Sequence, residues 1–268
     1  MVNFEKKNVF ISGGSSGIGL ALAKQFSSMG SNVTILARDK VKLSDAVDQI
    51  KQHQENKNQK ISSISADIRD YQVLSKALES FKDPVDILIN SAGITYPGRF
   101  IELDPEIFSD VIQTNYLGTV FLTKLIVPGM VKRRAGTIVN ISSLAGLVGI
   151  FGYTAYTPSK YALRGFSQCL RSELTPYGIS VHLVLPPDTD TPQLAFEREF
   201  MPETTRKINS SASQMSPEDV ATAIIRGIKK GKFNVIPGFE GKVLFAFAPI
   251  ANHFLYKFAV KQESKSIH

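Results

Sequence analysis

The chain has 268 residues, of which 43% are hydrophobic and 21% are charged, so it can bury a core and does not have the composition of a disordered protein. The single cysteine, Cys169, excludes an internal disulfide, and the spacing of the four histidines predicts no metal site. The net charge is +7, and residues 225–268 hold eight Lys or Arg against two Glu. The basic character therefore belongs to the C-terminal tail, and without zinc ligands or a recognition-helix pattern we expect no nucleic-acid binding.

The N-terminal residues 1–7 are polar and lead directly into an apolar run, which indicates no signal peptide. The chain has no continuous run of 18 apolar residues, so the sequence predicts no transmembrane helix. We therefore expect a cytoplasmic protein.

Apolar runs and helical periodicity alternate along the chain. In chain order the residues predict strand 8–12, helix 20–29, strand 32–37, helix 43–53, strand 61–66, helix 71–81, strand 85–89, helix 115–132, strand 136–141, helix 156–177, strand 180–185, helix 217–229 and strand 233–236. Strands that alternate with helices indicate βαβ units and a parallel sheet covered on both faces. The predicted fold class is α/β, a Rossmann-type doubly wound sheet of seven parallel strands in a single domain over residues 1–240, followed by a hydrophobic, basic extension over 241–268.

Residues 12–19, Ser-Gly-Gly-Ser-Ser-Gly-Ile-Gly, lie between the first strand and the first helix. Glycines there permit a tight turn and a close approach of phosphate to the backbone, and the helix N-terminus offers free N–H groups to a pyrophosphate. A glycine cluster alone is weak evidence for nucleotide binding, but this one lies between a strand and a helix, as in a dinucleotide site. The predicted cofactor-binding residues in this turn are Gly13, Ser15, Ser16, Gly17, Ile18 and Gly19.

The end of the second strand bears on the choice between NAD and NADP. Arg38 is the first residue after the strand, with Lys42 nearby, and an arginine here accepts a 2′-phosphate. We therefore expect NADPH/NADP as the cofactor, while Asp39 keeps NAD open, because a shift of one residue would exchange the two roles. Arg38 would alternatively be a surface cation paired with Asp39.

Further polar and small residues follow the next strands. Asp67 would accept a hydrogen bond from the adenine amino group, or would instead cap a helix. Asn90, Ala92 and Gly93 follow the fourth strand, where small residues leave room for a cofactor.

Tyr156 and Lys160 are four residues apart, so they share a helix face. A lysine ammonium favours the phenolate and would lower the tyrosine pKa, so that Tyr156 exchanges a proton with a carbonyl or alcohol oxygen. Ser143 would donate a hydrogen bond to the same oxygen, and Ser142 is the alternative candidate for this role. Tyr153 and Tyr161 are poorer candidates for the acid, because Thr157 follows Tyr153 by four residues and Tyr161 would face away.

These motifs resemble those of the short-chain dehydrogenase/reductase family over residues 8 to about 237. The glycine-rich motif matches at residues 12–19, the family's Asn-Asn-Ala-Gly matches Asn90-Ser91-Ala92-Gly93, and the catalytic serine, tyrosine and lysine match Ser143, Tyr156 and Lys160. The resemblance also implies that Asn115 anchors a proton-relay water, that Tyr156 and Lys160 contact the cofactor, and that no metal is needed. It further implies a homodimer or homotetramer formed through the two long helices.

The chain departs from the family after the sixth strand, where it reads Pro186-Pro187-Asp188-Thr189-Asp190-Thr191 in place of Pro-Gly. Pro187 has no N–H and a fixed φ, so the nicotinamide loop should be shaped differently, and Pro186, Thr189 and Thr191 are its candidate contacts. This string, with residues 149–156, resembles the 3-ketodihydrosphingosine reductase branch. That resemblance implies NADPH-dependent reduction of a long-chain lipid ketone.

Three segments are candidates for contact with a lipid. Residues 144–151 would line a long-chain pocket, or simply pack in the core. Residues 243–260 are rich in aromatic side chains but are interrupted by Pro249, and the apolar run is too short to span a membrane. They would bind a lipid surface peripherally, at the cytoplasmic face of a membrane, or pack on the pocket or a partner subunit. Residues 193–214 should form a mobile flap, whose Glu197, Glu199 and Glu203 would meet the substrate amine or, the favoured interpretation, form a solvated helix face.

Two other functions stay open at this point. The substrate would be another hydrophobic carbonyl or alcohol, such as a steroid, a retinoid or a 3-oxoacyl chain. A non-enzymatic cofactor-binding module is disfavoured, because that reading predicts loss of Ser143, Tyr156 or Lys160, and all three are present.

Overall fold

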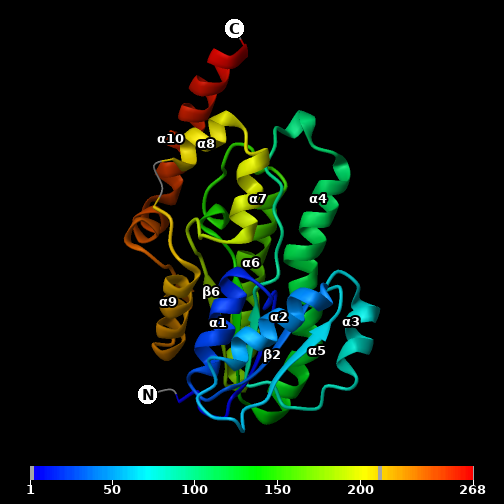
Figure 1. The fold of residues 1–268 in the computed structure, drawn as a ribbon. Coiled ribbons are helices and arrows are strands. Elements are labelled where there is room, and N and C mark those ends of the chain that lie inside the picture. The colour runs from blue at the N-terminus through cyan, green and yellow to red at the C-terminus, as the bar shows by residue number, and fades with distance from the viewer. Residues whose placement is uncertain (1–2, 211–212, 268) are drawn as a thin grey trace.

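The computed structural model describes residues 3–210 and 213–267 and contains one seven-stranded parallel sheet (Figure 1). The strand order β3-β2-β1-β4-β5-β6-β7 reverses direction beside β1, as in a doubly wound fold. This confirms the predicted fold class. The strands are β1 Asn8–Ser12, β2 Asn32–Ala37, β3 Ile61–Ser65, β4 Ile87–Asn90, β5 Gly136–Ile141, β6 Ile179–Val184 and β7 Asn234–Val235.

Helices cover both faces of the sheet, because successive side chains of each strand point to opposite sides. Val9 and Ile11 of β1 are buried in the core formed with α1 (Gly17–Ser27), α2 (Lys40–Lys51) and α9 (Pro217–Lys229). Phe10 is buried in the opposite core, formed with α3 (Tyr71–Leu78), α5 (Gly118–Arg133) and α6 (Tyr156–Leu174). Apolar residues on both faces of the strands explain the continuous apolar runs of the sequence.

The predicted helix 115–132 is preceded by further helical structure that the sequence did not reveal. Helix α4 (Pro105–Ile112) leads into a π-helical turn, Gln113–Leu117, which continues into α5. π-helical turns are rare and are found mostly at functional sites, and this one contains Asn115.

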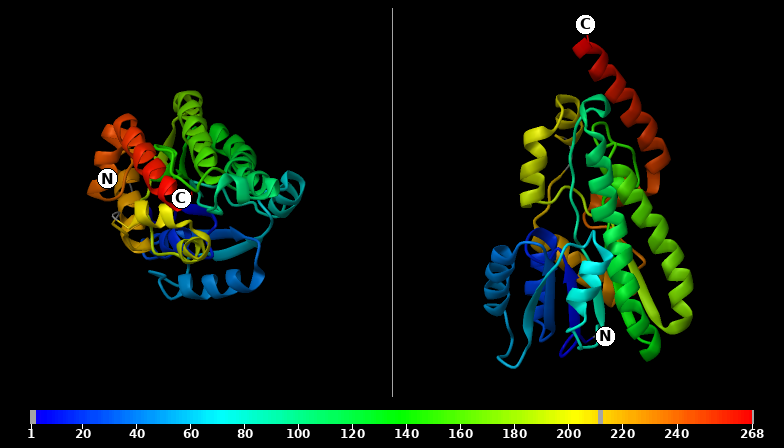
Figure 2. Two further views of the ribbon diagram at one scale, coloured as in Figure 1. Left: turned by 90° about the horizontal axis from the view of Figure 1, so that it is seen from above. Right: turned by 90° about the vertical axis from the view of Figure 1, so that its right-hand side faces the viewer.

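Two short helices and one long helix lie at the end of the sheet that holds the carboxyl ends of the strands. Residues 193–214, predicted as a flap, contain α7 (Pro192–Phe200) and α8 (Glu203–Asn209). Helix α10 (Phe239–Ile267) packs against α8 and extends past this end of the molecule, away from the N-terminal segment (Figures 1 and 2).

The sequence predicted that Pro249 interrupts the apolar C-terminal segment, which would then be too short to span a membrane. Helix α10 continues through Pro249 with a bend at Phe247, which accommodates a residue that lacks an N–H and crowds the preceding turn. By length and composition alone, residues 239–265 could cross a membrane, and only 6% of the most apolar stretch is buried. Two helical stretches therefore meet at this kink, and the interruption lies at Phe247, two residues before Pro249.

Candidate active site

The glycine-rich turn between β1 and α1 is built by contacts that leave no space for side chains. Gly13 and Gly17 have positive φ values of 68° and 52°. A Cβ on Gly13 would lie 2.7 Å from the Ala92 backbone nitrogen, and a Cβ on Gly19 would overlap the carbonyl oxygen of Gly13. Ser16 precedes α1 without a side-chain cap, so the first N–H groups of the helix face the site as an anion would require.

This turn opens into a cavity of about 810 Å³ that runs along the carboxyl ends of the strands. Most of the predicted site residues line it. They are Gly13, Ser15, Ser16, Gly17, Ile18, Arg38, Lys42, Asp67, Ala92, Gly93, Ser143, Tyr156, Lys160, Pro186, Thr189 and Thr191.

Three predicted residues lie behind the cavity wall instead. Gly19 supports the turn through its contact with Gly13. The Asn90 amide donates to Asn140 Oδ1 at 2.8 Å and to Thr123 Oγ1 at 3.1 Å, inside the protein. Asn115 is fully buried. Direct contact with the cofactor was expected for Gly19 and Asn90, but neither lines the cavity, and the Asn90 amide takes protein partners that lie within reach.

Asn115 connects the π-helical turn to the start of α6. Its side-chain oxygen accepts from Ile94 N at 2.7 Å, and its amide donates to Ile94 O and Ser159 Oγ, each at 2.9 Å. Ser159 in turn donates to the Tyr156 carbonyl oxygen at 2.6 Å. Asn115 therefore fixes the helix turn that presents Tyr156 and Lys160.

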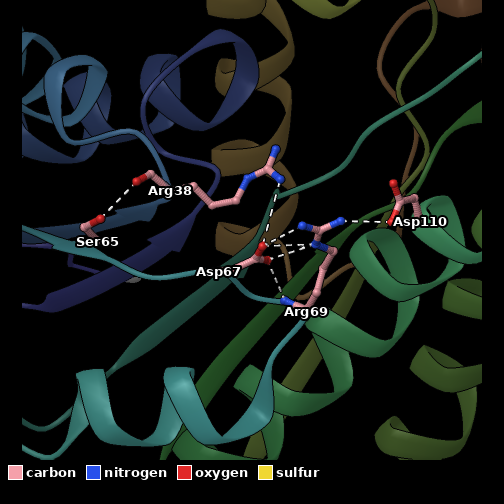
Figure 3. Close-up of polar contacts among 5 residues, drawn as sticks. All are labelled: Arg38, Ser65, Asp67, Arg69 and Asp110. Carbon is pink, nitrogen blue, oxygen red and sulfur yellow. Dashed lines mark hydrogen bonds and ion pairs between the residues drawn. The ribbon is translucent and has the colours of Figure 1, made fainter.

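Two arginines surround Asp67 beside β2 (Figure 3). Arg69 makes a forked contact with the Asp67 carboxylate, the shortest distance being 2.8 Å, and binds Asp110 at 2.9 Å. Arg38 lies 4.0 Å from Asp67, and its side chain is 58% exposed. Although partial burial opposes the shift, the hydrogen bonds from Arg69 hold the pKa of Asp67 below its usual range.

Asp39 lines the same cavity but has other partners. Its Oδ1 accepts from Val41 N at 2.9 Å and from Lys42 N at 3.1 Å, so it caps α2. The expected alternative pairing of Arg38 with Asp39 is therefore replaced by a pairing with Asp67. Arg69 was missed in the sequence, although it follows the predicted Asp67 by two residues.

The catalytic candidates meet where β5 and α6 approach. Lys160 Nζ donates to Ile141 O at 3.1 Å and lies 5.3 Å from the centre of the Tyr156 ring. The Ser143 side chain is within hydrogen-bonding reach of the Tyr156 hydroxyl. The Ser142 hydroxyl is instead committed to the Lys160 carbonyl oxygen at 3.0 Å. The geometry distinguishes the two serines in favour of Ser143.

The pKa of Tyr156 shifts in the direction opposite to the one expected. Burial and the negative charge of Glu197 raise it, and the hydrogen bond with Ser143 only partly opposes this. Burial also lowers the pKa of Lys160 to about 8. A protonated Tyr156 is the form that a proton donor requires, and Lys160 stays largely charged at neutral pH.

Two polar residues of α7 complete the site and were assigned differently in the sequence. Glu197 is buried and accepts from the Tyr153 hydroxyl at 2.6 Å, whereas the favoured interpretation placed it on a solvated helix face. Gln193, one helical turn earlier, donates to Glu197 Oε1 at 3.2 Å. The i, i+4 spacing of these two residues was the available signal.

The far end of the cavity is apolar and joins two segments that are distant in sequence. Leu144, Val148 and Ile150 line it, while Leu147 and Val148 also belong to a buried cluster, so residues 144–151 serve both the pocket and the core. Helix α10 contributes Leu244, Ala251, Phe254, Leu255 and Phe258 to the same wall.

A family model described as short chain dehydrogenase matches residues 7–201, most of the chain. The chain belongs to the short-chain dehydrogenase family. It is thus an oxidoreductase with the fold that the strand order displays.

Similar proteins agree with this membership. The chain is 39% identical to 3-ketodihydrosphingosine reductase of Bos taurus, over 88% of this chain and 73% of the relative. It is 36% identical to 3-ketodihydrosphingosine reductase of Dictyostelium discoideum, over 94% of this chain and 80% of that one. Among solved structures, it is similar to a short-chain dehydrogenase from Sphingobium yanoikuyae in complex with NADPH, with a TM-score of 0.78, 26% identity and coverage of 94% and 95%.

The loop after β6, where the sequence has a second proline, is held by hydrogen bonds within the loop and to its neighbours. Pro186 O accepts from Leu144 N at 3.0 Å, and Thr189 Oγ1 donates to Pro187 O at 2.9 Å. Thr191 Oγ1 accepts from Leu194 N at 3.3 Å and caps α7. The loop therefore uses both hydroxyls to hold its own shape while it lines the cavity.

Proposed function

We propose that this short-chain dehydrogenase is an NADPH-dependent reductase that converts a long-chain lipid ketone, 3-ketodihydrosphingosine, into dihydrosphingosine. One observation carries the proposal: a single cavity joins the glycine-rich turn, the Tyr156 hydroxyl and an apolar wall formed partly by α10. The names of the relatives from Bos taurus and Dictyostelium discoideum point to the same substrate.

The residues around the cavity fit a nicotinamide dinucleotide. The cradle is tight, since a Cβ on Gly13 would meet Ala92 and one on Gly93 would lie 3.3 Å from Asn115 Oδ1. The turn around Gly13 and Gly17 would hold the pyrophosphate, and Lys160 would bind the nicotinamide ribose. When bound, the dinucleotide supplies the hydride for the carbonyl carbon.

Side chains of the protein would donate the proton and stabilise the charge that develops on the oxygen. As the C=O π bond breaks, the Tyr156 hydroxyl gives its proton to the oxygen, and Ser143 donates a hydrogen bond to the same oxygen. The charge of Lys160 stabilises the phenolate that remains. Asn115 acts on this step by holding the start of α6, through Ser159.

Arg38 supports the choice of NADPH over NADH. Its guanidinium lines the cavity and forms only a long, exposed ion pair with Asp67, so it can turn to a 2′-phosphate. Asp39, the residue that would favour NADH, is engaged in capping α2. Ser15 and Lys42 line the same end of the cavity, and Asp67 borders the adenine end.

Replacing Arg38 with alanine should weaken NADPH binding about ten- to a hundredfold and change NADH binding little. A charge-assisted hydrogen bond contributes about 1.5–3 kcal/mol to binding, and only NADPH has the 2′-phosphate that would form one with Arg38. The dissociation constants of both nucleotides, measured by fluorescence titration, test this. Lys40→Ala is the matched control, an exposed cation two residues away that does not line the cavity. Equal losses for both nucleotides would show that Arg38 does not contact the phosphate.

We further propose that residues 1–240 form the dinucleotide-binding and catalytic domain and that 241–268 form an extension that contacts a lipid surface. Phe247, Ile250 and Tyr256 of α10 are each more than half exposed, beside Lys257 and Lys261. Exposed apolar side chains close to cations suit anionic lipid, and other residues of α10 contribute to the wall of the cavity. The protein would then work at the cytoplasmic face of a membrane. We also propose a homodimer or homotetramer, which light scattering on the purified protein would measure.

Ile250→Glu should reduce binding to phosphatidylserine vesicles about tenfold or more, because an apolar side chain of this size contributes about 1.5–3 kcal/mol when buried. Vesicle sedimentation measures this. Val41→Glu is the control, since Val41 is 71% exposed and lies on α2. If Ile250→Glu binds as well as the unchanged protein, α10 does not insert into lipid.

The proposed reaction is tested by following NADPH and NADH consumption with 3-ketodihydrosphingosine in detergent micelles. We expect turnover with NADPH and little with NADH. Turnover only with steroid, retinoid or 3-oxoacyl ketones would keep the reductase and replace the sphingoid substrate.

A further inference from the structure

Glu197 is a buried carboxylate in the wall of the cavity. Only 7% of Glu197 is exposed, and the residue lines the cavity. Its two oxygens face different partners: Oε2 accepts from the Tyr153 hydroxyl at 2.6 Å, and Oε1 accepts from Gln193 Nε2 at 3.2 Å. These contacts fix the carboxylate in one orientation without bringing a positive charge to it.

The charges around Glu197 do not neutralise it fully. Asp188, which also lines the cavity, repels it, and Lys160 attracts it from the catalytic side. Burial raises the pKa of both Glu197 and Asp188, because water solvates their charged forms poorly. A buried carboxylate is costly unless it is paired with a cation. A cationic group entering the cavity would supply that pair.

The carboxylate is also close to the reacting oxygen. Gln193 donates to Glu197 Oε1 and lies near enough to Tyr156 to lower the pKa of its hydroxyl, and the rings of Tyr153 and Tyr156 lie 5.8 Å apart. A substrate whose ketone oxygen binds at Tyr156 could therefore turn one of the two carbons next to the ketone, the one that bears a polar group, toward Glu197. In 3-ketodihydrosphingosine that neighbouring carbon carries the amine.

We propose that Glu197 is a specificity-determining residue that binds the ammonium group next to the substrate ketone, with Tyr153 and Gln193 holding its carboxylate in place. The proposal rests on the proposed reductase function and names the part of the substrate that this site recognises. Once the ammonium is paired with Glu197, the ketone is held in register with Tyr156 and Ser143.

The test compares two ketones in the same micelles, 3-ketodihydrosphingosine and its N-acetyl derivative, which keeps the ketone and the chain but has no positive charge. We expect the unchanged enzyme to prefer the free amine by about ten- to a hundredfold in kcat/KM, mainly through KM. In Glu197→Gln the ratio of the two kcat/KM values should fall toward one. Glu199→Gln is the matched control, since Glu199 lies on the same helix but is exposed and outside the cavity, and should keep the preference.

A second measurement needs no variant and therefore tests the proposal even if the Glu197→Gln protein does not fold. With the unchanged enzyme, octadecylamine should inhibit at least tenfold more strongly than octadecanol at equal mole fraction in the micelles. Equal inhibition, or a preference that persists in Glu197→Gln, would overturn the role of Glu197 while leaving the reductase in place. An unchanged enzyme that reduces neither ketone would overturn the proposed function and this inference with it.

Discussion

Replacing Tyr156 with phenylalanine should lower kcat for ketone reduction by about 10²–10⁴-fold and leave NADPH affinity nearly unchanged. The substitution removes the proton donor, whose contribution as a general acid is of that size. It also keeps the ring that packs against Tyr153 and faces Lys160. Steady-state rates together with NADPH titration separate the two effects.

The same helix provides the control for this variant. Tyr161 is 37% exposed and does not line the cavity, so Tyr161→Phe should retain full activity. If Tyr156→Phe turned over at the rate of the unchanged enzyme, the proton would have to come from another group, and the assignment of the acid would fail.

Gly19→Ala should weaken dinucleotide binding strongly and destabilise the fold. Its methyl group would overlap the Gly13 carbonyl oxygen, which belongs to backbone and cannot rotate away. The turn would have to move, and with it the N–H groups at the start of α1 that face the pyrophosphate. We expect a rise of at least about tenfold in the NADPH dissociation constant, equivalent to roughly 1.4 kcal/mol. Titration and thermal unfolding measure the two effects.

Gly165→Ala is the matched comparison, because a Cβ at Gly165 in α6 would meet nothing within 4 Å. There the substitution should keep cofactor binding and raise stability by up to about 1 kcal/mol, since alanine is the better helix former. If Gly19→Ala bound NADPH as tightly as Gly165→Ala, the tight contact in the turn would not matter for the cofactor.

The sequence predicted the sheet and its order of elements well, because buried parallel strands such as β2 are continuous apolar runs bounded by turns. It also located the Gly13–Gly19 turn and the pair Tyr156 and Lys160, since both depend on local spacing. Both features can be predicted from local spacing because the turn lies within one strand–turn–helix unit, and Tyr156 and Lys160 lie on one helix face.

The features that were missed depend on contacts between distant segments. Asn90 matched a cofactor motif, yet Asn140, far along the chain, holds its side chain inside the protein. Glu197 was interpreted as solvated because nothing in its neighbourhood revealed that Tyr153 lies opposite. The raised pKa of Tyr156 has the same origin, because burial and Glu197 outweigh the expected influence of Lys160.

The most direct test of the account follows the hydride itself. Purified protein is incubated with 3-ketodihydrosphingosine and NADPH deuterated at the transferred position of nicotinamide C4, and the lipid product is analysed by mass spectrometry. We expect dihydrosphingosine one mass unit heavier, with deuterium on the carbon that carried the ketone, and none from Tyr156→Phe on the same timescale. Protein that binds NADPH but yields no deuterated dihydrosphingosine would contradict the central claim.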